Sequence, residues 1–113
     1  MSDCLFCRIV RREIPAQVVA EDERCLAFRD IAPQAPVHIL VIPKAHTSSL
    51  EAVEDAAAVV GAMAQMAQQV ARAEGVATSG YRTVINTGAD GGQTVGHLHL
   101  HLLGGRDLAW PPG

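Results

Sequence analysis

The sequence Gly91-Gly92-Gln93-Thr94-Val95-Gly96-His97-Leu98-His99-Leu100-His101-Leu102-Leu103-Gly104-Gly105 contains the most regular pattern in this chain of 113 residues. Histidine and leucine alternate from His97 to Leu102, and a period of two is typical of a half-buried β-strand. Because successive side chains of a strand leave opposite faces, the three leucines are predicted to face the core. The three histidines are predicted to form a row on the other face, in steps of roughly 6.5–7 Å.

Such a row suits acid–base or nucleophilic chemistry better than it suits one shared metal ion. Zn–N bonds measure about 2.0–2.1 Å, whereas His97 and His101 would lie about 13 Å apart along a strand. About three quarters of free histidine side chains are neutral at pH 7. The middle ring, His99, is therefore predicted to be a nucleophile with a ring on each side. The glycine-rich turn before Thr94 offers N–H groups and one hydroxyl to an anion such as a phosphate.

The segment His97-Leu98-His99-Leu100-His101-Leu102-Leu103 resembles the His-φ-His-φ-His-φ-φ signature (φ is apolar) of the histidine triad nucleotide hydrolases and transferases. Four more segments are similar to the Hint branch of that family, the nucleoside phosphoramidate hydrolases: Phe28-Arg29-Asp30-Ile31-Ala32-Pro33-Gln34-Ala35-Pro36, Val37-His38-Ile39-Leu40-Val41-Ile42-Pro43-Lys44, Asp90-Gly91-Gly92-Gln93 and Trp110-Pro111-Pro112-Gly113. The similarity covers nearly the whole chain. It implies an α+β, HIT-like fold whose homodimer joins two sheets into a ten-stranded sheet.

The resemblance also assigns roles to individual residues. His99 would attack the α-phosphorus, His101 and His38 would complete the proton network, and His97 would brace the row. Asp30 would hold the ribose hydroxyls, while Asn86, Gln93 and Thr94 would hold phosphate oxygens. The full set that the resemblance places against the nucleotide is Phe6, Ile9, Phe28, Asp30, Ile31, Leu40, Asn86, Gly92, Gln93, Thr94, Val95 and Trp110.

The activity implied is hydrolysis of the P–N bond of purine nucleoside 5′-phosphoramidates, and of aminoacyl-adenylates as well. It would proceed through a nucleotidyl-histidine and release AMP or GMP. No cofactor is required for this chemistry. Two alternatives are a non-catalytic nucleotide- or zinc-binding regulatory module and a dinucleoside polyphosphate hydrolase of the same fold. The first leaves the histidine nucleophile without a purpose, and the Trp-Pro-Pro-Gly ending speaks against the second.

A structural zinc site is a separate hypothesis. Cys4 and Cys7 lie one helical turn apart, and a Cys-x-x-Cys pair is half of many zinc sites. By resemblance, His46 and His97 would complete a Cys₂His₂ set, which suits tetrahedral Zn²⁺. The competing interpretation is a pair of reduced thiols without a metal.

Composition bounds the remaining possibilities. A chain of 113 residues with 49% hydrophobic and 19% charged residues indicates one packed domain, residues 1–113. The net charge of −3 argues against broad nucleic-acid binding, which needs a basic surface. No apolar run approaches the roughly eighteen residues of a membrane span, and no signal peptide is recognisable at the start. Three cysteines do not form a disulfide framework, so a cytoplasmic location is expected.

Local patterns predict the order of the elements. A short helix is expected over residues 4–12 with Asp3 as its N-cap, and a hairpin over residues 18–20 and 25–28. A strand over residues 37–42 follows. The form of a capping box at Ser48-Ser49-Leu50-Glu51 predicts the start of a long helix that carries the apolar run 56–73 and stops at Gly75. Strands over 81–86 and at the histidines give five mostly antiparallel strands with helices alongside. The tail, residues 106–113, is expected at the dimer interface.

Overall fold

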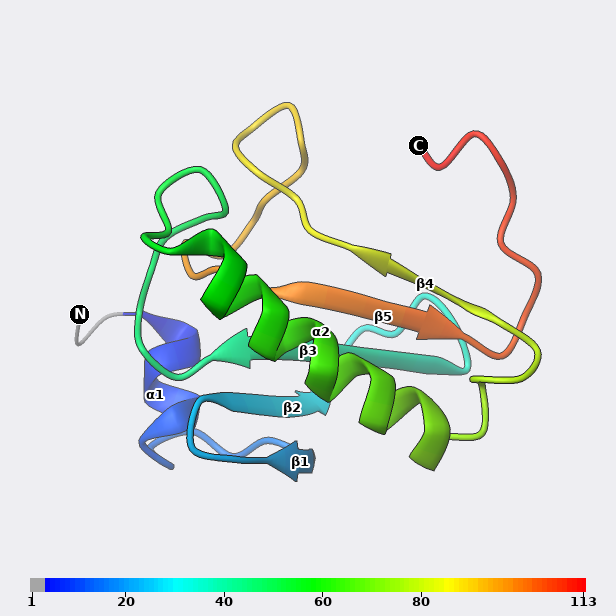
Figure 1. The fold of residues 1–113 in the computed structure, drawn as a ribbon, viewed down its shortest axis with the longest axis horizontal. Helices are drawn as coiled ribbons and strands as arrows, with labels where there is room; N and C mark the ends of the chain where they lie inside the picture. Colours follow the sequence, from blue (N-terminus) through cyan, green and yellow to red (C-terminus); the bar gives the residue numbers. More distant parts are fainter. Residues whose placement is uncertain (1–3) are drawn as a thin grey trace.

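The chain folds around one antiparallel sheet, whose arrangement is shown by a computed structural model describing residues 4–113. The strands are β1 (Val18–Glu21), β2 (Cys25–Arg29), β3 (Val37–Pro43), β4 (Tyr81–Val84) and β5 (Leu100–Gly104). They lie in the order β1-β2-β3-β5-β4, and every adjacent pair is antiparallel. A short helix α1 (Leu5–Val10) and a long helix α2 (Ala56–Ala73) complete the fold (Figure 1). The predicted α+β class with five antiparallel strands, one long helix and one short helix is confirmed.

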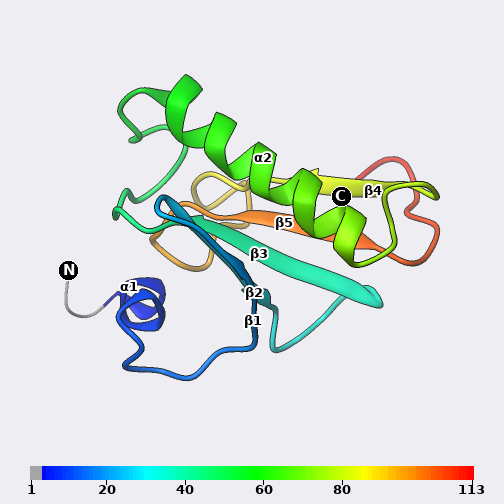
Figure 2. The ribbon, with the colours of Figure 1, turned by 60° about the horizontal axis from the view of Figure 1, so that its bottom comes forward.

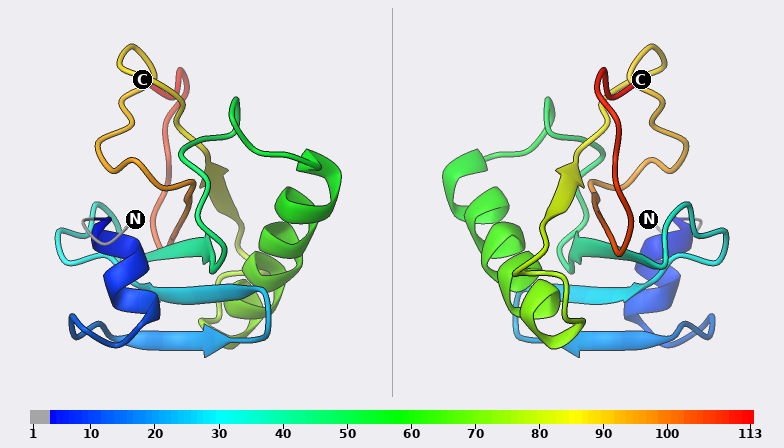
Figure 3. Two further views of the ribbon diagram at one scale, coloured as in Figure 1. Left: turned by 90° about the vertical axis from the view of Figure 1, so that its left-hand side faces the viewer. Right: turned by 90° about the vertical axis from the view of Figure 1, so that its right-hand side faces the viewer.

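The two helices cover opposite faces of the sheet (Figures 2 and 3). On one face, α2 buries Met63, Met66 and Val70 among the leucines of the histidine segment. Leu98, Leu100 and Leu102 are all buried there, as the alternation predicts. On the other face, α1 packs a smaller cluster consisting of Phe6, Ile9, Leu26, Phe28, Leu40 and Ile42. Alternation along the central strands thus separates an α2 face from an α1 face, and the histidines share the α1 side.

The histidine segment is less regular than predicted. Strand β5 begins at Leu100, so His97 and His99 precede it. The N–H of Leu98 donates to the carbonyl oxygen of Thr47 at 2.8 Å rather than to a neighbouring strand. The predicted strand through all three histidines is therefore wrong in its extent, although the rings lie on the face opposite the leucines as expected. His97 turns toward α1 and the Thr47 loop. Only His101 lies in the strand, between Leu40 of β3 and Val84 of β4.

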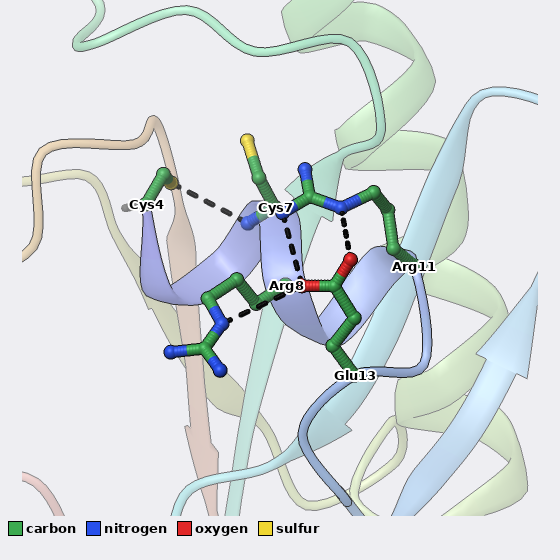
Figure 4. A network of polar contacts seen from close by, with 5 residues as sticks. All are labelled: Cys4, Cys7, Arg8, Arg11 and Glu13. Carbon is green, nitrogen blue, oxygen red and sulfur yellow. Dashed lines mark hydrogen bonds and ion pairs between the residues drawn. The ribbon is translucent and has the colours of Figure 1, made fainter. Parts of the chain in front are cut away.

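Helix α1 is shorter than predicted because its first and last turns are capped locally. Its N-cap is Cys4, whose Sγ accepts a hydrogen bond from the N–H of Cys7 at 3.4 Å. The predicted cap, Asp3, lies outside the described residues. At the other end, Arg12 adopts a left-handed φ of 63°, which ends the helical path. Figure 4 shows the outer side of this helix, where Arg8 and Arg11 both reach the carboxylate of Glu13.

Helix α2 begins at Ala56 and not at the Ser48–Glu51 sequence, so the predicted capping box is wrong. The hydroxyl of Ser49 accepts from the N–H of Ala52 at 3.2 Å, closing a single turn. The helix cap is Asp55, whose carboxylate accepts from Ala58 N–H at 3.3 Å. Its φ of 54° bends the chain between that turn and the helix. The predicted stop is confirmed by Gly75, which takes a φ of 78°.

The last segment of the chain returns past β4. The guanidinium of Arg82 in β4 donates to the carbonyl oxygens of Leu108 and Ala109 at 3.2 and 2.8 Å. Strand β4 itself ends at Val84, two residues before the predicted boundary, because Ile85 and Asn86 leave the ladder. Within residues 4–113, neither helix combines the length and hydropathy needed to cross a membrane.

Candidate functional site

The five histidines form two adjoining clusters on the α1 side of the sheet. His38, His99 and His101 make the first cluster, with ring centroids 5.0–5.2 Å apart between neighbours. The second cluster joins His46 and His97 to the two thiols of α1. Phe6 lies between the clusters, with its ring edge-on to both His97 and His99. The predicted gathering of histidines is found, but it divides into two sites with different chemistry.

His99 is held in one tautomer by the main chain. Its Nδ1 lies 2.7 Å from the carbonyl oxygen of His97. Because a carbonyl oxygen only accepts hydrogen bonds, this Nδ1 carries the proton. In the neutral ring the lone pair therefore lies on Nε2. A buried imidazole with a free Nε2 and a fixed orientation is what a nucleophile needs.

A hydrogen-bond chain fixes the tautomers of the next two rings. The N–H of Gln34 donates to Nδ1 of His38 at 3.0 Å, so the proton of neutral His38 resides on Nε2. That Nε2 lies 2.9 Å from Nδ1 of His101, to which it donates. The proton of His101 then resides on its own Nε2. Asp30 lies beside the bond between His38 and His101, with Oδ2 3.4 Å from Nε2 of His38.

Burial keeps these two rings uncharged at neutral pH. It lowers the pKa of His101 to about 4, assisted by the nearby rings of His99 and His38, and Asp30 opposes the shift. Burial also lowers the pKa of His38, again against the carboxylate of Asp30. Both rings are therefore neutral at pH 7, as the hydrogen-bond chain requires. Because each neutral ring has one N–H and one lone pair, His38 and His101 can take part in proton transfer at pH 7.

Acidification should destabilise the protein through His101. The unfolded chain takes up a proton near the ordinary histidine pKa of about 6.5, whereas the native ring stays neutral until about pH 4. The free energy of unfolding is therefore at its full value above pH 6.5 and falls as the pH drops toward 4. Between pH 7 and 4.5 this single group should account for about 2–3 kcal/mol. Urea unfolding at a series of pH values measures it.

The matched control for that titration is His101→Asn, which removes the titrating ring and leaves the carboxylates in place. Its stability should fall less steeply over the same pH range. Equal slopes for the two proteins would show that the acid sensitivity arises elsewhere.

The second cluster has the geometry of a metal site. Nδ1 of His97 lies 3.3 Å from Sγ of Cys4, 3.6 Å from Sγ of Cys7 and 3.1 Å from Nδ1 of His46. Sγ of Cys7 is also 3.2 Å from Nδ1 of His46. Tetrahedral bonds of about 2.0–2.1 Å to nitrogen and 2.3 Å to sulfur would separate neighbouring ligand atoms by about 3.3–3.8 Å. Four of the six distances between the ligand atoms are thus 3.1–3.6 Å, close to tetrahedral spacing, and all six are within 4.8 Å.

The hydrogen bonds of His97 support the same assignment. Its Nε2 donates to the carbonyl oxygen of Pro43 at 2.8 Å, so the lone pair lies on Nδ1, at the centre of the cluster. Metal-ligating histidines almost always donate their other N–H in this way. Burial lowers the pKa of His97, with the Pro43 carbonyl opposing the shift. A neutral ring with its lone pair directed at two thiols can hold a metal ion.

Asp30, His38 and His101 also bring three ligand atoms within 4.8 Å of one another, but their hydrogen bonds do not suit a metal. A metal on Nε2 of His38 would require the proton on Nδ1. That position already accepts the N–H of Gln34. The N–H of Gln34 and an N–H on Nδ1 of His38 would then face each other, which is unfavourable. The cluster therefore suits proton transfer better than metal binding.

The predicted nucleotide contacts are spread around these clusters. Phe6, Ile9, Phe28 and Leu40 are buried together, with Val95 packed against them. Asp30 is half-buried, and its Oδ1 accepts the N–H of Ala32 at 2.8 Å. Ile31 is fully exposed at 102%, and Trp110 is 81% exposed. The predicted apolar contacts to the base are therefore mostly buried, whereas the side chains of Ile31 and Trp110 are exposed to solvent.

Gln93 has a role that its sequence position did not reveal. Its Nε2 donates to the carbonyl oxygens of Ser48 and Val95 at 2.6 and 3.0 Å, and its Oε1 accepts the N–H of Gly88 at 3.1 Å. Both amide hydrogens are thus used within the protein. The side chain ties the Ser48 loop to residues 88–95. The main-chain N–H of Gln93 donates to the carbonyl oxygen of Gly88 at 3.0 Å, which leaves the exposed Thr94 hydroxyl as a candidate for phosphate oxygens. Gly92 takes a φ of 82° in this turn, and Asn86 is half-buried nearby in sequence.

Two surface hollows accompany the clusters, and neither is lined by His99 or His101. One, of about 540 Å³, is lined by Gln93, Thr94 and Val95 together with Ser48, Ser49 and Glu51. The other, of about 530 Å³, lies between the Lys44–Thr47 loop and α2 and includes His46 and Cys25. The first is the better candidate for substrate because it contains three predicted contacts. The second hollow lies beside His46, one of the four candidate metal ligands.

Sequence reasoning missed the groups that set the tautomers. They are the carbonyl oxygens of His97 and Pro43 and the N–H of Gln34. Every residue except proline carries the same main-chain groups, so the sequence holds no signal for these three. The side chains they orient were all predicted.

Comparison with known proteins identifies the class. Residues 11–108 match the model of the HIT domain, and the chain belongs to the HIT domain family. It is 62% identical over 112 residues to an uncharacterised HIT-like protein of Synechococcus elongatus, covering 98% of this chain and 97% of that protein.

Solved structures agree with that membership. A HIT family hydrolase from Legionella pneumophila superposes with a TM-score of 0.95 at 52% identity, covering 98% of this chain and 100% of that one. A zinc-bound histidine triad family protein from Mycobacterium smegmatis superposes at 0.84 with 38% identity, covering 94% and 77% of the two chains.

Proposed function

We propose that the protein hydrolyses the P–N bond of purine nucleoside 5′-phosphoramidates, with aminoacyl-adenylates as further substrates, and releases the nucleoside monophosphate. One observation carries the proposal: the carbonyl oxygen of His97 fixes the proton of His99 on Nδ1 and leaves Nε2 free. The likeness to proteins named HIT family hydrolases supports the reaction class. The choice of a phosphoramidate and of a purine base rests on the resemblance of the sequence to the Hint branch.

In the first step, Nε2 of His99 attacks the α-phosphorus. A bond forms between this nitrogen and phosphorus, the P–N bond of the substrate breaks, and the leaving nitrogen takes the proton from Nε2 of His101. A solvent proton replaces it in the same step, so His101 stays neutral and the phosphorylated His99, whose ring centroid is 5.0 Å away, carries one positive charge. His38 holds the tautomer of His101 by donating to its Nδ1.

In the second step, water attacks the phosphorus of the nucleotidyl-histidine. The bond between phosphorus and Nε2 breaks, its electron pair returns to His99, and the water proton is released to solvent. The nucleoside monophosphate leaves, and the starting tautomers are recovered. General acid–base catalysis of this kind contributes typically 10²- to 10⁴-fold.

Zinc in the cluster of Cys4, Cys7, His46 and His97 is a second part of the proposal. The gathering of the four ligand atoms within 4.8 Å, with four of their six distances at 3.1–3.6 Å, supports it, as does the zinc-bound relative from Mycobacterium smegmatis. When bound, the ion would crosslink α1, the loop that carries His46 and the start of the histidine segment. It takes no part in the two chemical steps.

We also propose that the protein forms a homodimer through β4 and the tail. Strand β4 is an outer strand of the described sheet, and an unpaired edge is able to bind a second copy. Tyr81 and Trp110 expose large apolar surface beside it. Sedimentation equilibrium gives the mass; a monomer at micromolar concentration would contradict this part of the proposal.

The test of the main proposal uses an adenosine 5′-phosphoramidate of a fluorescent amine as substrate. The protein should release amine and AMP in equal amounts, and acid quenching should trap an adenylated protein visible by mass spectrometry. Digestion should locate the adenylate on His99. AMP binding without turnover would favour the regulatory module, and faster cleavage of a dinucleoside polyphosphate would favour the other hydrolase.

A further inference from the structure

Arg106, two residues after β5, binds the loop of residues 30–36, whose Gln34 N–H contacts His38. Its Nε and Nη2 both donate to the carbonyl oxygen of Gln34, at 3.1 and 2.9 Å. Its remaining nitrogen, Nη1, donates to the carbonyl oxygen of Asp107 at 2.9 Å. A two-pronged contact from the planar guanidinium to one acceptor fixes both the position and the direction of that carbonyl.

The residue before Arg106 contacts the same loop. Gly105 adopts a φ of 90°, and a Cβ placed on it would lie 2.9 Å from Cβ of Pro36. A side chain here would have to displace the proline or distort the turn. The turn after β5 therefore packs directly against residues 34–36, by a close contact at Gly105 and a hydrogen-bonded contact at Arg106.

The gripped loop carries the N–H that sets the tautomer of His38. Residues between Asp30 and Val37 belong to no strand, so no sheet ladder holds Gln34 in place. Its side chain bonds only within the loop, to the carbonyl oxygen of Ala32 at 3.0 Å. Besides its N–H bond to His38, Gln34 is thus held by the contact of its carbonyl oxygen with Arg106, just after the strand that bears His101.

We propose that Arg106 is a positioning residue for proton transfer: by holding Gln34, it keeps the proton of His38 on Nε2, where it is donated to His101. The inference rests on the proposed function for its effect on turnover. Its effect on the His38 tautomer does not depend on any substrate. No substrate contact is assigned to Arg106.

Loss of this grip has a defined chemical result. Once the Gln34 N–H moves away, neutral His38 is free to carry its proton on Nδ1. Its Nε2 then has a lone pair facing the lone pair of His101 Nδ1, in a pair now separated by 2.9 Å. One of the two rings must change its tautomer or move. Either change removes the proton from the position that serves the leaving group.

The experiment compares Arg106→Ala with Arg24→Ala. Arg24 is a matched control because its guanidinium also donates to a main-chain carbonyl, that of Ala58, but does not contact Gln34. With the phosphoramidate substrate, Arg106→Ala should lower kcat by about tenfold, a fraction of a general acid–base contribution, and leave KM within about twofold. Arg24→Ala should stay within about twofold in both. Arg106→Lys, which can make a single contact, should recover part of the loss.

Nitrogen-15 NMR of the histidine rings, recorded without substrate, supplies the second readout. The intact protein should show His38 protonated on Nε2, and Arg106→Ala should show a mixture of tautomers while remaining folded. Gly105→Ala, which displaces Pro36, should give the same mixture. An unchanged His38 tautomer in folded Arg106→Ala overturns the proposal, as does an equal loss of kcat in both arginine variants. A protein without turnover but with the expected tautomer shift would contradict the proposed function and support the positioning role.

Discussion

Replacing His99 by alanine should lower kcat for phosphoramidate hydrolysis by at least about a thousandfold, because the variant lacks the nitrogen that forms the covalent intermediate. The neighbouring rings cannot substitute for it. His97 has its lone pair directed at the thiols of α1, and His101 has its proton on the nitrogen that faces the substrate. Stopped-time assays of AMP release measure the loss. Acid-quenched samples of the variant should contain no adenylated protein.

His99→Asn is the matched control for that variant. Its amide N–H can still donate to the carbonyl oxygen of His97, so the local backbone should be preserved. It should bind AMP about as tightly as the intact protein and be as inactive as the alanine variant. Retention of more than about a tenth of the activity by either variant would exclude His99 as the nucleophile.

Removing the metal from the cluster around His97 should cost the protein much of its stability. A ligand present at a thousand times its dissociation constant stabilises the native state by about 4 kcal/mol. For a domain of this size each kcal/mol corresponds to roughly 4–8 °C. Chelation of the zinc-loaded protein should therefore lower Tm by about 16–32 °C, and added Zn²⁺ should restore it. Differential scanning calorimetry with parallel metal analysis measures both.

Two cysteine variants make that experiment specific. Cys7→Ser removes one of the four ligands, so its Tm should respond little to chelator and its zinc content should fall. Cys25→Ala removes a buried thiol of the α2-side core, away from the cluster, and should keep one zinc per chain. A chelator effect of the same size in Cys7→Ser would place the metal elsewhere.

Periodicity predicted the parts of the fold that depend on side-chain patterns. Alternating leucines located the buried face of the histidine segment, and the apolar run from Ala56 to Ala73 matched α2. The capping-box motif failed because a left-handed Asp55 separates the Ser49 turn from the helix. Few residues other than glycine adopt such a φ, so nothing in the Ser48–Glu51 sequence announces it.

The sequence was enough to predict which side chains make up the candidate site, but not how they are arranged. The pattern could not show that His97 would leave the row, because that depends on the hydrogen bond between Leu98 N–H and the distant Thr47 carbonyl. It also could not show that the Gln93 amide donates to the carbonyl oxygen of Ser48, 45 residues earlier in the chain. Both results come from pairings between residues far apart in the chain, which a local pattern does not contain.

During synthesis, β5 leaves the ribosome last of the five strands, yet in the finished sheet it lies between β3 and β4. Until residues 100–104 emerge, the inner edge of β3 stays open and β4 has no partner to pair with. The same few residues bring His101 and, just before it, His99. Closure of the sheet and assembly of the histidines are thus one late event. A nascent chain that has not reached residue 97 leaves an edge of β3 unpaired and lacks three of the five histidines, so proteases that remove it remove a protein without an assembled site.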